Sequence, residues 1–575
     1  MCIRILLSSV LLGALPVNSQ PTTIDLAIED PTATLVGAYP SAGRPIAAGD
    51  VNGDGWVDVI VSSCTAQPLG QRHGELTIVW GSGSGFNGTI PLGSSGMAHV
   101  YGPNDGDLAW CSVATGDFNG DDFDDILWGH PGAPLPAAIG RVYMIPGSQN
   151  FPALIDLATP PSGVVIISGH AQSAFMGLAV DAGDINGDEI DDMVMSAPYL
   201  EHAEVYIIAG SGSLLPSYST SAVVPGLTRI VDDSPFTLMG TDIASGDIDR
   251  DGMFDLVLGS PGASQSEDDG SVRIIHGMSE LPSLVPASDD ALRPKVILAE
   301  FTNGQLGRAV AIGHVDYDGR LDIAVSAPAA PGAGCSGCGV TYVLRDAGAL
   351  PETVALGSTG LPITRLVGAG ESTIYGDELT MADLDGDLRD DVVVGNYPLL
   401  GNQRARTVIA FAHALTNGSH ALASDPAFTR IIEKEIGDLL GSSLATADLN
   451  KDGVDDLLIG APGTAEAYIV NGTYAPTAVP PTASALLLRQ NYPNPFNPQT
   501  SIPYFVPAHS RVRMAVFDAS GQLIAALVDS EQAAGDHVAR WDGRDHSGRE
   551  VASGVYFCKL VAGSSSTSIK LVLVR

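Results

Sequence analysis

DVNGDGWVD, at residues 50–58, is the stretch of sequence that decides the fold, because six similar copies follow it along the chain. Each copy carries acidic or amide side chains at alternate positions and is followed by a short apolar run. The first positions of successive copies are 63 to 69 residues apart, and so even a period is typical of a repeat architecture. We number the copies as acidic loops one to seven, and their residues as positions 1 to 9. The six further loops are DFNGDDFDD (117–125), DINGDEIDD (184–192), DIDRDGMFD (247–255), HVDYDGRLD (314–322), DLDGDLRDD (383–391) and DLNKDGVDD (448–456).

Each repeat contains four short strand-like segments. A small-residue segment precedes the acidic loop, an apolar segment follows it, and two further segments complete the unit, as in LAVDAG, MVMSAP, AEVYIIAG and TRIVDD of the third repeat. Short strands bounded by Gly, Pro and Asp predict antiparallel hairpins. Four-stranded units at a constant period are typical of β-propeller blades. The sequence therefore predicts an all-β protein whose main domain is a seven-bladed β-propeller.

The two ends of the repeat array predict how the ring closes. The seventh repeat has no fourth strand-like segment, because a Pro-rich stretch begins at Tyr474. The segment ATLVG (33–37), which precedes the first repeat, resembles the fourth-strand segment TRLVG (364–368). We therefore expect the N-terminal segment to supply the last strand of blade seven. An open solenoid would leave that segment without a partner.

The acidic loops have the oxygen spacing of a cation-binding turn. Side-chain oxygens at positions 1, 3, 5 and 9, together with the backbone carbonyl at position 7, can surround one ion. Hard oxygen ligands in a flexible turn favour Ca²⁺ over Mg²⁺. The start of the loop resembles an EF-hand, but position 12 is not Glu and strands flank the loop. The ligands that we expect in six loops are Asp50, Asn52, Asp54, Trp56 and Asp58; Asp117, Asn119, Asp121, Phe123 and Asp125; Asp184, Asn186, Asp188, Ile190 and Asp192; Asp247, Asp249, Asp251, Met253 and Asp255; Asp383, Asp385, Asp387, Arg389 and Asp391; Asp448, Asn450, Asp452, Val454 and Asp456.

Two loops depart from the pattern. A sharp turn requires a residue that tolerates the left-handed region, and Leu388, at position 6 of loop six, fits this requirement least well. In loop five His314 replaces the first acid, and imidazole is a poor Ca²⁺ ligand. We expect the loop-five site to be weak or empty, with Arg320 partly replacing the ion. The acids that remain there are Asp316, Asp318 and Asp322.

Two roles for these ions are open. In the first, each ion is structural and joins two strands of one blade. In the second, calcium contributes to a ligand-contact site or acts as a concentration switch. Seven similar copies favour the structural role, because a single active centre does not need repetition.

The repeats resemble the FG-GAP repeats of integrin alpha-subunit propellers and their bacterial relatives. The acidic loops carry the resemblance, with apolar-Gly pairs before them, such as Met176-Gly177, and small-residue and Pro pieces after them, such as Ser196-Ala197-Pro198. The resemblance covers about residues 32–473 and implies a seven-bladed propeller with calcium in the blade hairpins. In integrins not every blade binds metal, whereas six loops here carry the oxygen set. Pairing with an integrin beta subunit is not implied.

The C-terminal part predicts a second domain. A Pro-, Ala- and Thr-rich linker (475–486) follows the propeller (20–474), and alternating strand-like segments in 487–575 predict a small β-sandwich. NYPNPFNPQTSIPYFVP and WDGRDHSGREVASGVYF resemble the immunoglobulin-like C-terminal sorting domain of type IX secretion cargo, and the Ig-like domain of the flagellar hook-capping protein. That resemblance implies that the outer-membrane secretion machinery of a bacterium recognises 487–575. A passive stalk is the alternative.

The N-terminus and the charge agree with export. Residues 1–19 have a basic start at Arg4, an apolar core and small residues before Gln20, as in a signal peptide. No later apolar run approaches the ~18 residues that span a bilayer, so we expect no transmembrane segment in the mature chain. The net charge of −38, from 28 Lys and Arg against 66 Asp and Glu, excludes a nucleic-acid binder that relies on a basic surface. We expect a secreted or bacterial cell-surface protein.

Five cysteines follow the predicted signal peptide. In an exported protein, the spacing of Cys335 and Cys338 favours a local disulfide over a redox or zinc site. Cys64 and Cys111 can bridge neighbouring repeats, although their spacing leaves the pairing open. The odd number leaves at least one cysteine without a partner inside the chain.

The sequence contains no GxSxG, HExxH or phosphate-binding P-loop motif. Trp56, Trp80, Trp110 and Trp128 fall in the first two repeats, where core packing is favoured over an exposed patch that stacks on sugars.

Three functions stay open. The first is a calcium-stabilised adhesion or recognition protein that binds an extracellular protein or polysaccharide through loops on one propeller face. The second is an extracellular hydrolase or lyase whose catalytic residues come from several blades. The third is a purely structural surface protein. Acids outside the calcium pattern with perturbed pKa values in a funnel would favour the enzyme.

Overall fold

The computed structural model describes residues 23–28, 30–39, 41–66, 74–103, 112–134, 137–262, 269–332, 335–358, 361–368, 373–398, 406–422, 424–425, 427–472, 486–488, 491, 496, 500–506, 509–518, 521–532, 535–546, 549, 551–563 and 565–573. The predicted signal peptide and all but the last residue of the predicted linker lie outside these ranges. The regular secondary structure of the described part is nearly all β-strand, with three short 3₁₀ helices, η1 (Asp290–Leu292), η2 (Ala347–Ala349) and η3 (Ala412–Ala414).

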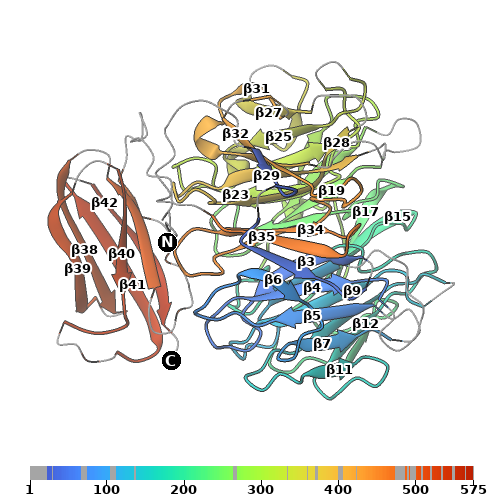
Figure 1. The fold of residues 1–575 in the computed structure, drawn as a ribbon, viewed down its shortest axis with the longest axis horizontal. Coiled ribbons are helices and arrows are strands. Elements are labelled where there is room, and N and C mark those ends of the chain that lie inside the picture. The colour runs from blue at the N-terminus through green and yellow to red at the C-terminus, as the bar shows by residue number, and fades with distance from the viewer. Residues whose placement is uncertain are drawn as a thin grey trace, which may run out of the picture.

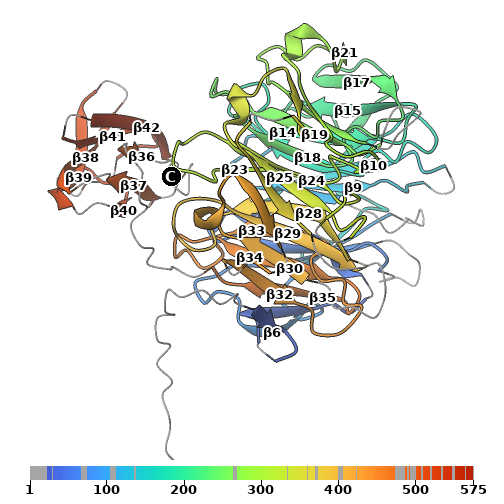
Figure 2. The ribbon, with the colours of Figure 1, turned by 90° about the horizontal axis from the view of Figure 1, so that it is seen from above.

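Seven five-stranded sheets form the blades of the propeller (Figures 1 and 2). Blade one contains β3 (Ala42–Gly49), β4 (Asp58–Ser63), β5 (Glu75–Val79), β7 (Ala98–Tyr101) and β11 (Leu154–Asp156). Blade two contains β8 (Ser112–Gly116), β9 (Asp125–His130), β10 (Arg141–Ile145), β12 (Val165–Ser168) and β16 (Ser217–Ser219). Blade three contains β13 (Val180–Gly183), β14 (Asp192–Ala197), β15 (His202–Ile208), β17 (Leu227–Pro235) and β21 (Val285–Pro286). Blade four contains β18 (Ile243–Gly246), β19 (Asp255–Ser260), β20 (Ser271–Ile275), β22 (Lys295–Leu298) and β26 (Thr353–Ala355).

The remaining three blades follow the same order. Blade five contains β23 (Val310–Gly313), β24 (Asp322–Ala327), β25 (Val340–Leu344), β27 (Ile363–Val367) and β31 (Gly418–Ala421). Blade six contains β28 (Thr373–Ala382), β29 (Asp391–Pro398), β30 (Arg406–Ala410), β32 (Phe428–Ile432) and β1 (Thr23–Asp25). Blade seven contains β33 (Leu444–Ala447), β34 (Asp456–Ala461), β35 (Glu466–Val470), β2 (Ala33–Val36) and β6 (Gly88–Pro91).

The fifth strand of each blade comes from the next repeat, which sequence analysis did not predict. Four strands pair antiparallel, and the fourth then pairs in parallel with a short strand, as β7 pairs with β11. This short strand lies in the connection between the third and fourth strands of the following repeat, except in blade six, where it is the N-terminal strand β1. This pairing covers the outer edge of each sheet, which would otherwise expose unpaired backbone groups.

The N-terminal segment closes the ring, as predicted from the sequence. β2 pairs antiparallel with β35, so Ala33 lies opposite Ile469 and completes blade seven. The structure adds a second closing contact, because β1 pairs in parallel with β32 of blade six. The N-terminal segment therefore supplies strands to blades six and seven, whose other strands come mainly from the C-terminal end of the repeat array.

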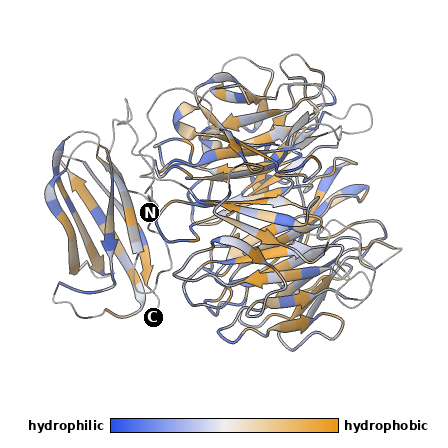
Figure 3. Ribbon diagram, in the orientation of Figure 1, coloured by the Kyte–Doolittle hydropathy of each residue, from blue (hydrophilic) through white to orange (hydrophobic). Residues whose placement is uncertain are grey.

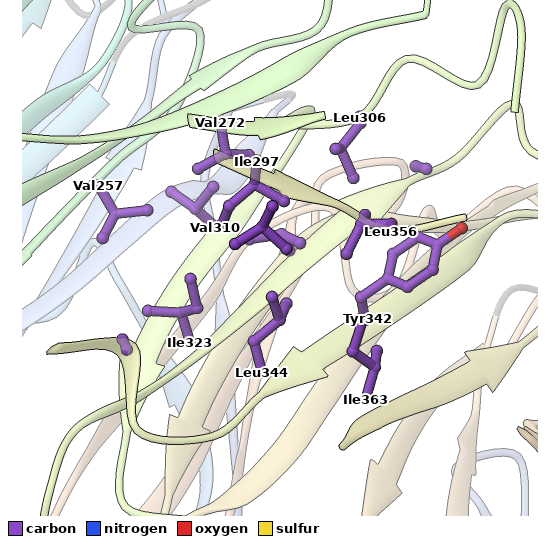
Figure 4. Close-up of a cluster of buried hydrophobic side chains, with 14 of the residues drawn as sticks. Val257, Val272, Ile297, Leu306, Val310, Ile323, Tyr342, Leu344, Leu356 and Ile363 are labelled. Atoms are coloured by element: carbon purple, nitrogen blue, oxygen red, sulfur yellow. The ribbon is translucent and has the colours of Figure 1, made fainter. Parts of the chain in front are cut away.

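The core lies between adjacent blades. Second strands such as β4 and β19 are buried along their whole length, because a neighbouring blade covers each face. Figure 4 shows one such layer, in which Val257 and Val272 of blade four pack with Ile323 and Tyr342 of blade five. Figure 3 shows hydrophobic colour along many of the blade strands and hydrophilic colour on loops.

The C-terminal domain is a β-sandwich of a three-stranded and a four-stranded sheet, and it lies beside the propeller (Figures 1 and 2). Its core contains Trp541, whose ring meets that of Tyr556 edge to face at 5.1 Å. Lys570 donates a 2.6 Å hydrogen bond to Glu189 of the propeller. The strands are β36 (Leu487–Leu488), β37 (Thr500–Val506) and β40 (Gly535–Trp541), against β38 (Ser510–Asp518), β39 (Leu523–Gln532), β41 (Gly554–Ala562) and β42 (Ser565–Leu573).

Candidate metal centres

All seven acidic loops lie on one face of the propeller, because each connects the first strand of a blade to the second. Loop one, for example, runs from the end of β3 to the start of β4. The first strands of neighbouring blades contact one another around the axis, so the loops that follow them form a belt around one end of the central channel.

Six loops share a wrapped backbone in which positions 4 and 6 are both left-handed. In loop one these are Gly53 and Gly55, with φ of 66° and 82°. Leu388, the predicted poor fit in loop six, still has φ of 65°, and its N–H donates to Asp383 at 2.7 Å. In loop five only position 6 has a positive φ, at Gly319. The backbone thus separates loop five from the other six.

Hydrogen bonds turn the predicted ligands of loop one toward its centre. Asp50 accepts from the N–H groups of Asp54 and Gly55 at 3.1 and 2.8 Å. Asn52 Oδ1 accepts from Asp54 N–H at 2.8 Å, and Asp54 Oδ1 accepts from Trp56 N–H at 2.9 Å. The side chains at positions 1, 3 and 5 are therefore held around one point by backbone donors.

Position 9 has a structural role that the spacing alone does not reveal. It is the first residue of the second strand in every blade, and all seven carboxylates there are fully buried. Asp58 accepts from Val51 N–H at 3.0 Å and from Gly81 N–H at 2.8 Å. The same carboxylate thus ties the start of the acidic loop to the end of the third strand.

In loops one, two, three and seven, burial raises the pKa of the position-9 carboxyl group, and the carboxylates at positions 1 and 5 raise it further. The pKa rises to about 7 for Asp58, Asp192 and Asp456, and to about 8 for Asp125. A cation among these groups favours their ionised form. The loops therefore have the electrostatics of a cation site.

Adjacent loops are joined by a residue that sequence analysis overlooked. Position 8 is Asp in four loops, and three of these side chains accept the N–H at position 1 of the preceding loop: Asp124 from Asp50 at 2.6 Å, Asp191 from Asp117 at 3.1 Å, and Asp390 from His314 at 2.6 Å. The Asp-Asp pair at positions 8 and 9 of these loops is the sequence feature that could have predicted this contact.

Position 7 also reaches the preceding loop. The ring of Phe123 packs on Gly53, where an added Cβ would lie 2.5 Å from it. The ring of Trp56 lies 4.2 Å from the Lys451 ammonium of loop seven, in a cation–π contact. Neighbouring loops are thus in direct contact around the belt.

Basic side chains occupy loops four, five and six. In loop four the Arg293 guanidinium donates to Asp249 at 2.7 Å and to Asp251 at 3.1 Å. Arg320 was expected to replace the ion in loop five, but it pairs with Asp346 instead. The basic group near that loop's acids is Arg345, 3.5 Å from Asp316.

The donor set in the remaining loops fits a hard divalent cation. Loops one, two, three and seven offer carboxylate and amide oxygens only, and no described basic group lies within salt-bridge distance of their predicted ligands. Loop four shows how close such oxygens come, because Asp247, Asp249 and Asp251 each offer one within 4.8 Å of the others.

Other predicted features lie away from the belt. Cys335 and Cys338 form the expected local disulfide, whereas Cys111 and Trp110 lie outside the described residues. Trp128 is fully buried, and Trp80 is partly buried and packs against Phe151, in agreement with core packing.

Family models match both parts of the chain. The model described as FG-GAP repeat matches residues 239–275 and 440–474, and the FG-GAP-like repeat model matches residues 50–128. The model described as FlgD Ig-like domain matches residues 502–566. The propeller thus contains segments similar to FG-GAP repeats, and the tail contains a segment similar to the FlgD Ig-like domain.

Curated relatives match only part of this chain. Integrin alpha pat-2 of Caenorhabditis briggsae is 28% identical over 312 residues, which is 46% of this chain and 24% of that protein. Phosphatidylinositol-glycan-specific phospholipase D of Dictyostelium discoideum is 28% identical over 208 residues, 33% of this chain and 22% of that protein. The chain thus spans less than a quarter of the length of these relatives.

Solved structures resemble this chain distantly. PorZ, described as an essential bacterial surface component of the type-IX secretion system of Porphyromonas gingivalis, has a TM-score of 0.34 at 16% identity, covering 90% of this chain and 58% of that one. The exotype rhamnogalacturonan lyase YesX has a TM-score of 0.38 at 12% identity, covering 77% and 76%. Among the described residues, no helix has the length and apolarity needed to cross a bilayer.

Proposed function

We propose that this FG-GAP propeller is a calcium-stabilised recognition or adhesion protein that acts outside the cell, on an extracellular protein or polysaccharide. The calcium ions occupy acidic loops and stabilise the blades, and loops on the propeller surface contact the ligand. The immunoglobulin-like tail serves export, through recognition of residues 487–575 by an outer-membrane secretion machinery.

One observation carries the calcium part. Buried carboxylates at position 9, such as Asp58 and Asp125, have a pKa that burial raises to about 7 or 8, and they stand beside two or three further oxygen side chains. In loops one, two, three and seven, no described basic group lies within salt-bridge distance of these predicted ligands. Without a cation, ionisation of these groups at neutral pH costs folding free energy. Positions 1, 3, 5 and 9 would hold Ca²⁺, which would neutralise the group of carboxylates and join two strands.

The opposite face of the propeller supports recognition. Connections from the second to the third strand, and from one blade to the next, emerge there, away from the acidic belt. Tyr199 and Phe236 lie in such connections with exposed fractions of 46% and 51%, and the Tyr199 ring contacts Phe175 at 5.2 Å. Exposed aromatic rings supply contact area for a protein or sugar ligand.

The export proposal rests on the tail. Residues 502–566 match the FlgD Ig-like model, and the sequence resemblance to sorting domains covers the same region. Deleting residues 487–575 should leave the propeller inside the cell envelope, whereas the full chain should reach the medium or the outer surface. Fractionation and immunoblotting measure this, and secretion of the truncated chain would contradict the proposed role of the tail.

Recognition is tested by applying the purified full chain to an array of glycans and matrix proteins, in calcium and in chelator. We expect a bound ligand class, weaker with Tyr199→Ala and Phe236→Ala and unchanged with Leu523→Ala, which alters an equally exposed apolar residue in the tail. If the folded protein bound nothing on the array, the result would contradict the recognition function and leave an enzyme or a structural surface protein.

A hydrolase or lyase is the second candidate, favoured by acids outside the metal pattern. Asp377 and Glu378 lie in an irregularity of the inner strand β28, where the register shifts between Tyr375 and Leu379. Asp377 pairs with Arg308 at 2.9 Å. Burial, with the nearby charges of Asp242 and Asp377, raises the pKa of Glu378 to about 8, although Arg44 and Arg308 oppose this shift.

A protonated carboxyl beside an ionised one can act as a general acid. Hydrolysis or elimination of polysaccharides that is abolished by Glu378→Gln, but not by Glu201→Gln in a surface connection, would favour the enzyme. Absence of turnover across a broad polysaccharide and lipid panel would reject it.

A further inference from the structure

Loop four already contains positive charge where the ion was expected. The Arg293 side chain follows η1 and spans the carboxylates at positions 3 and 5, Asp249 and Asp251. His276, which is buried at the end of the third strand, places Nδ1 3.4 Å from Asp249 and 3.2 Å from Asp255. Three of the four predicted ligand side chains thus have a basic group of the chain as neighbour.

Loop six repeats this arrangement with different residues. The Arg389 guanidinium makes two contacts with Asp387 and lies over the ring of Tyr317 at 4.6 Å, which fixes its position. His413 places Nδ1 3.3 Å from Asp385. Asp385 and Asp387 are only 4% and 1% exposed, so water reaches these carboxylates little, and the Arg389 guanidinium places a positive charge beside them.

Loop five is held by an imidazole as well as by Arg345. His314 Nδ1 donates a 2.8 Å hydrogen bond to the carbonyl of Arg320, which is the position-7 oxygen that faces the ion in the proposed sites. The imidazole therefore links positions 1 and 7 directly, as the ion would. The Arg345 guanidinium lies 3.5 Å from Asp316, at position 3.

We infer that the basic side chains of blades four, five and six replace calcium, so that ions bind only in the contiguous blades seven, one, two and three. A guanidinium donates to two carboxylates in a fixed planar geometry and needs no dehydration of a divalent ion. An ion entering loop four would have to displace Arg293 and meet its repulsion. This inference rests on the proposed calcium binding and limits it to four loops.

The ring is thus divided into four blades that bind calcium and three that do not. The N-terminal closing strand β2 lies in blade seven, which belongs to the calcium-dependent half. Chelation should therefore loosen blades seven, one, two and three, including the seam, while blades four, five and six keep their internal charge pairs. Hydrogen exchange with mass spectrometry should show faster exchange in chelator over 448–470, 33–63 and 112–197, and little change over 243–344.

The count of bound ions tests the inference directly. Native mass spectrometry of the full chain with added Ca²⁺ should give four ions per chain. The double variant R293A/H276N, which frees the acids of loop four, should give five. R511A removes a comparably exposed arginine from Asp529 in the tail sandwich and should leave the count at four.

The outcomes separate this inference from the proposed function. Six ions in the wild type, or no gain in R293A/H276N with a native far-UV spectrum, would overturn the inference while leaving calcium binding intact. No bound ion at all would overturn both. If R293A/H276N fails to fold, R389A in loop six provides a second test, with the same expected gain of one. Zinc bound by the wild type at Asp249, Asp255 and His276 would also overturn the inference.

Discussion

Removal of calcium should lower the melting temperature of the propeller by about 11 °C. A ligand present at 100 times its dissociation constant stabilises the folded state by about 2.7 kcal/mol per site, so four sites contribute about 11 kcal/mol. Unfolding of a domain releases about 2.1 cal/mol/K per residue. For a propeller of about 450 residues, the entropy is about 0.95 kcal/mol/K, which converts the loss into about 11 °C.

Differential scanning calorimetry of the full chain measures this shift, in calcium and in a chelator, with magnesium kept constant as the control for ionic strength. The tail sandwich, which carries none of the acidic loops, should melt at the same temperature in both conditions. A second addition of calcium in excess should restore the original transition.

A shift below about 3 °C, with mass spectrometry showing that the ions had left, would refute the reasoning. The hydrogen bonds of Asp58 and its six counterparts would then hold the blades without any ion. A large shift with magnesium alone in place of calcium would refute the choice of ion but not the structural role.

Three further predictions follow from individual contacts. Asp124→Ala should destabilise the protein by about 2 kcal/mol in chemical denaturation, because the position-1 N–H of loop one loses a charged acceptor between blades; a change below 0.5 kcal/mol would contradict this role. Glu378 has a pKa raised from 4.5 to about 8, so at pH 7 its side chain is neutral in the folded protein but ionised in the unfolded chain. Its contribution to the free energy of unfolding therefore falls as the pH rises from about 4.5 to 8. Glu378→Gln should accordingly exceed the wild type in stability at pH 8 by about 1–2 kcal/mol, with little difference at pH 4.5, and equal stability at both pH values would contradict the pKa. His314→Asp combined with Arg345→Ala should add one bound calcium, and an unchanged count by mass spectrometry would reject the replacement of the ion in loop five.

The sequence by itself determined the repeat, the number of blades and the strand that closes the ring. Those features follow from local patterns that recur at a fixed spacing, since each blade is built from consecutive residues. The match between ATLVG and TRLVG identified β2 as the missing strand of blade seven. The tail sandwich was predicted in the same way, from alternating strands bounded by turns.

Only the tertiary structure decided which acidic loops carry their own positive charge. Arg293 lies 42 residues from Asp251 in sequence, and His276 and Arg345 come from the ends of third strands. Their approach depends on how the third strand and its following turn lie against the loop, which no spacing rule specifies. The same holds for Asp124, whose partner is in another blade. The sequence determines which oxygen side chains each loop carries, whereas the packing of distant segments determines which basic side chains lie beside them.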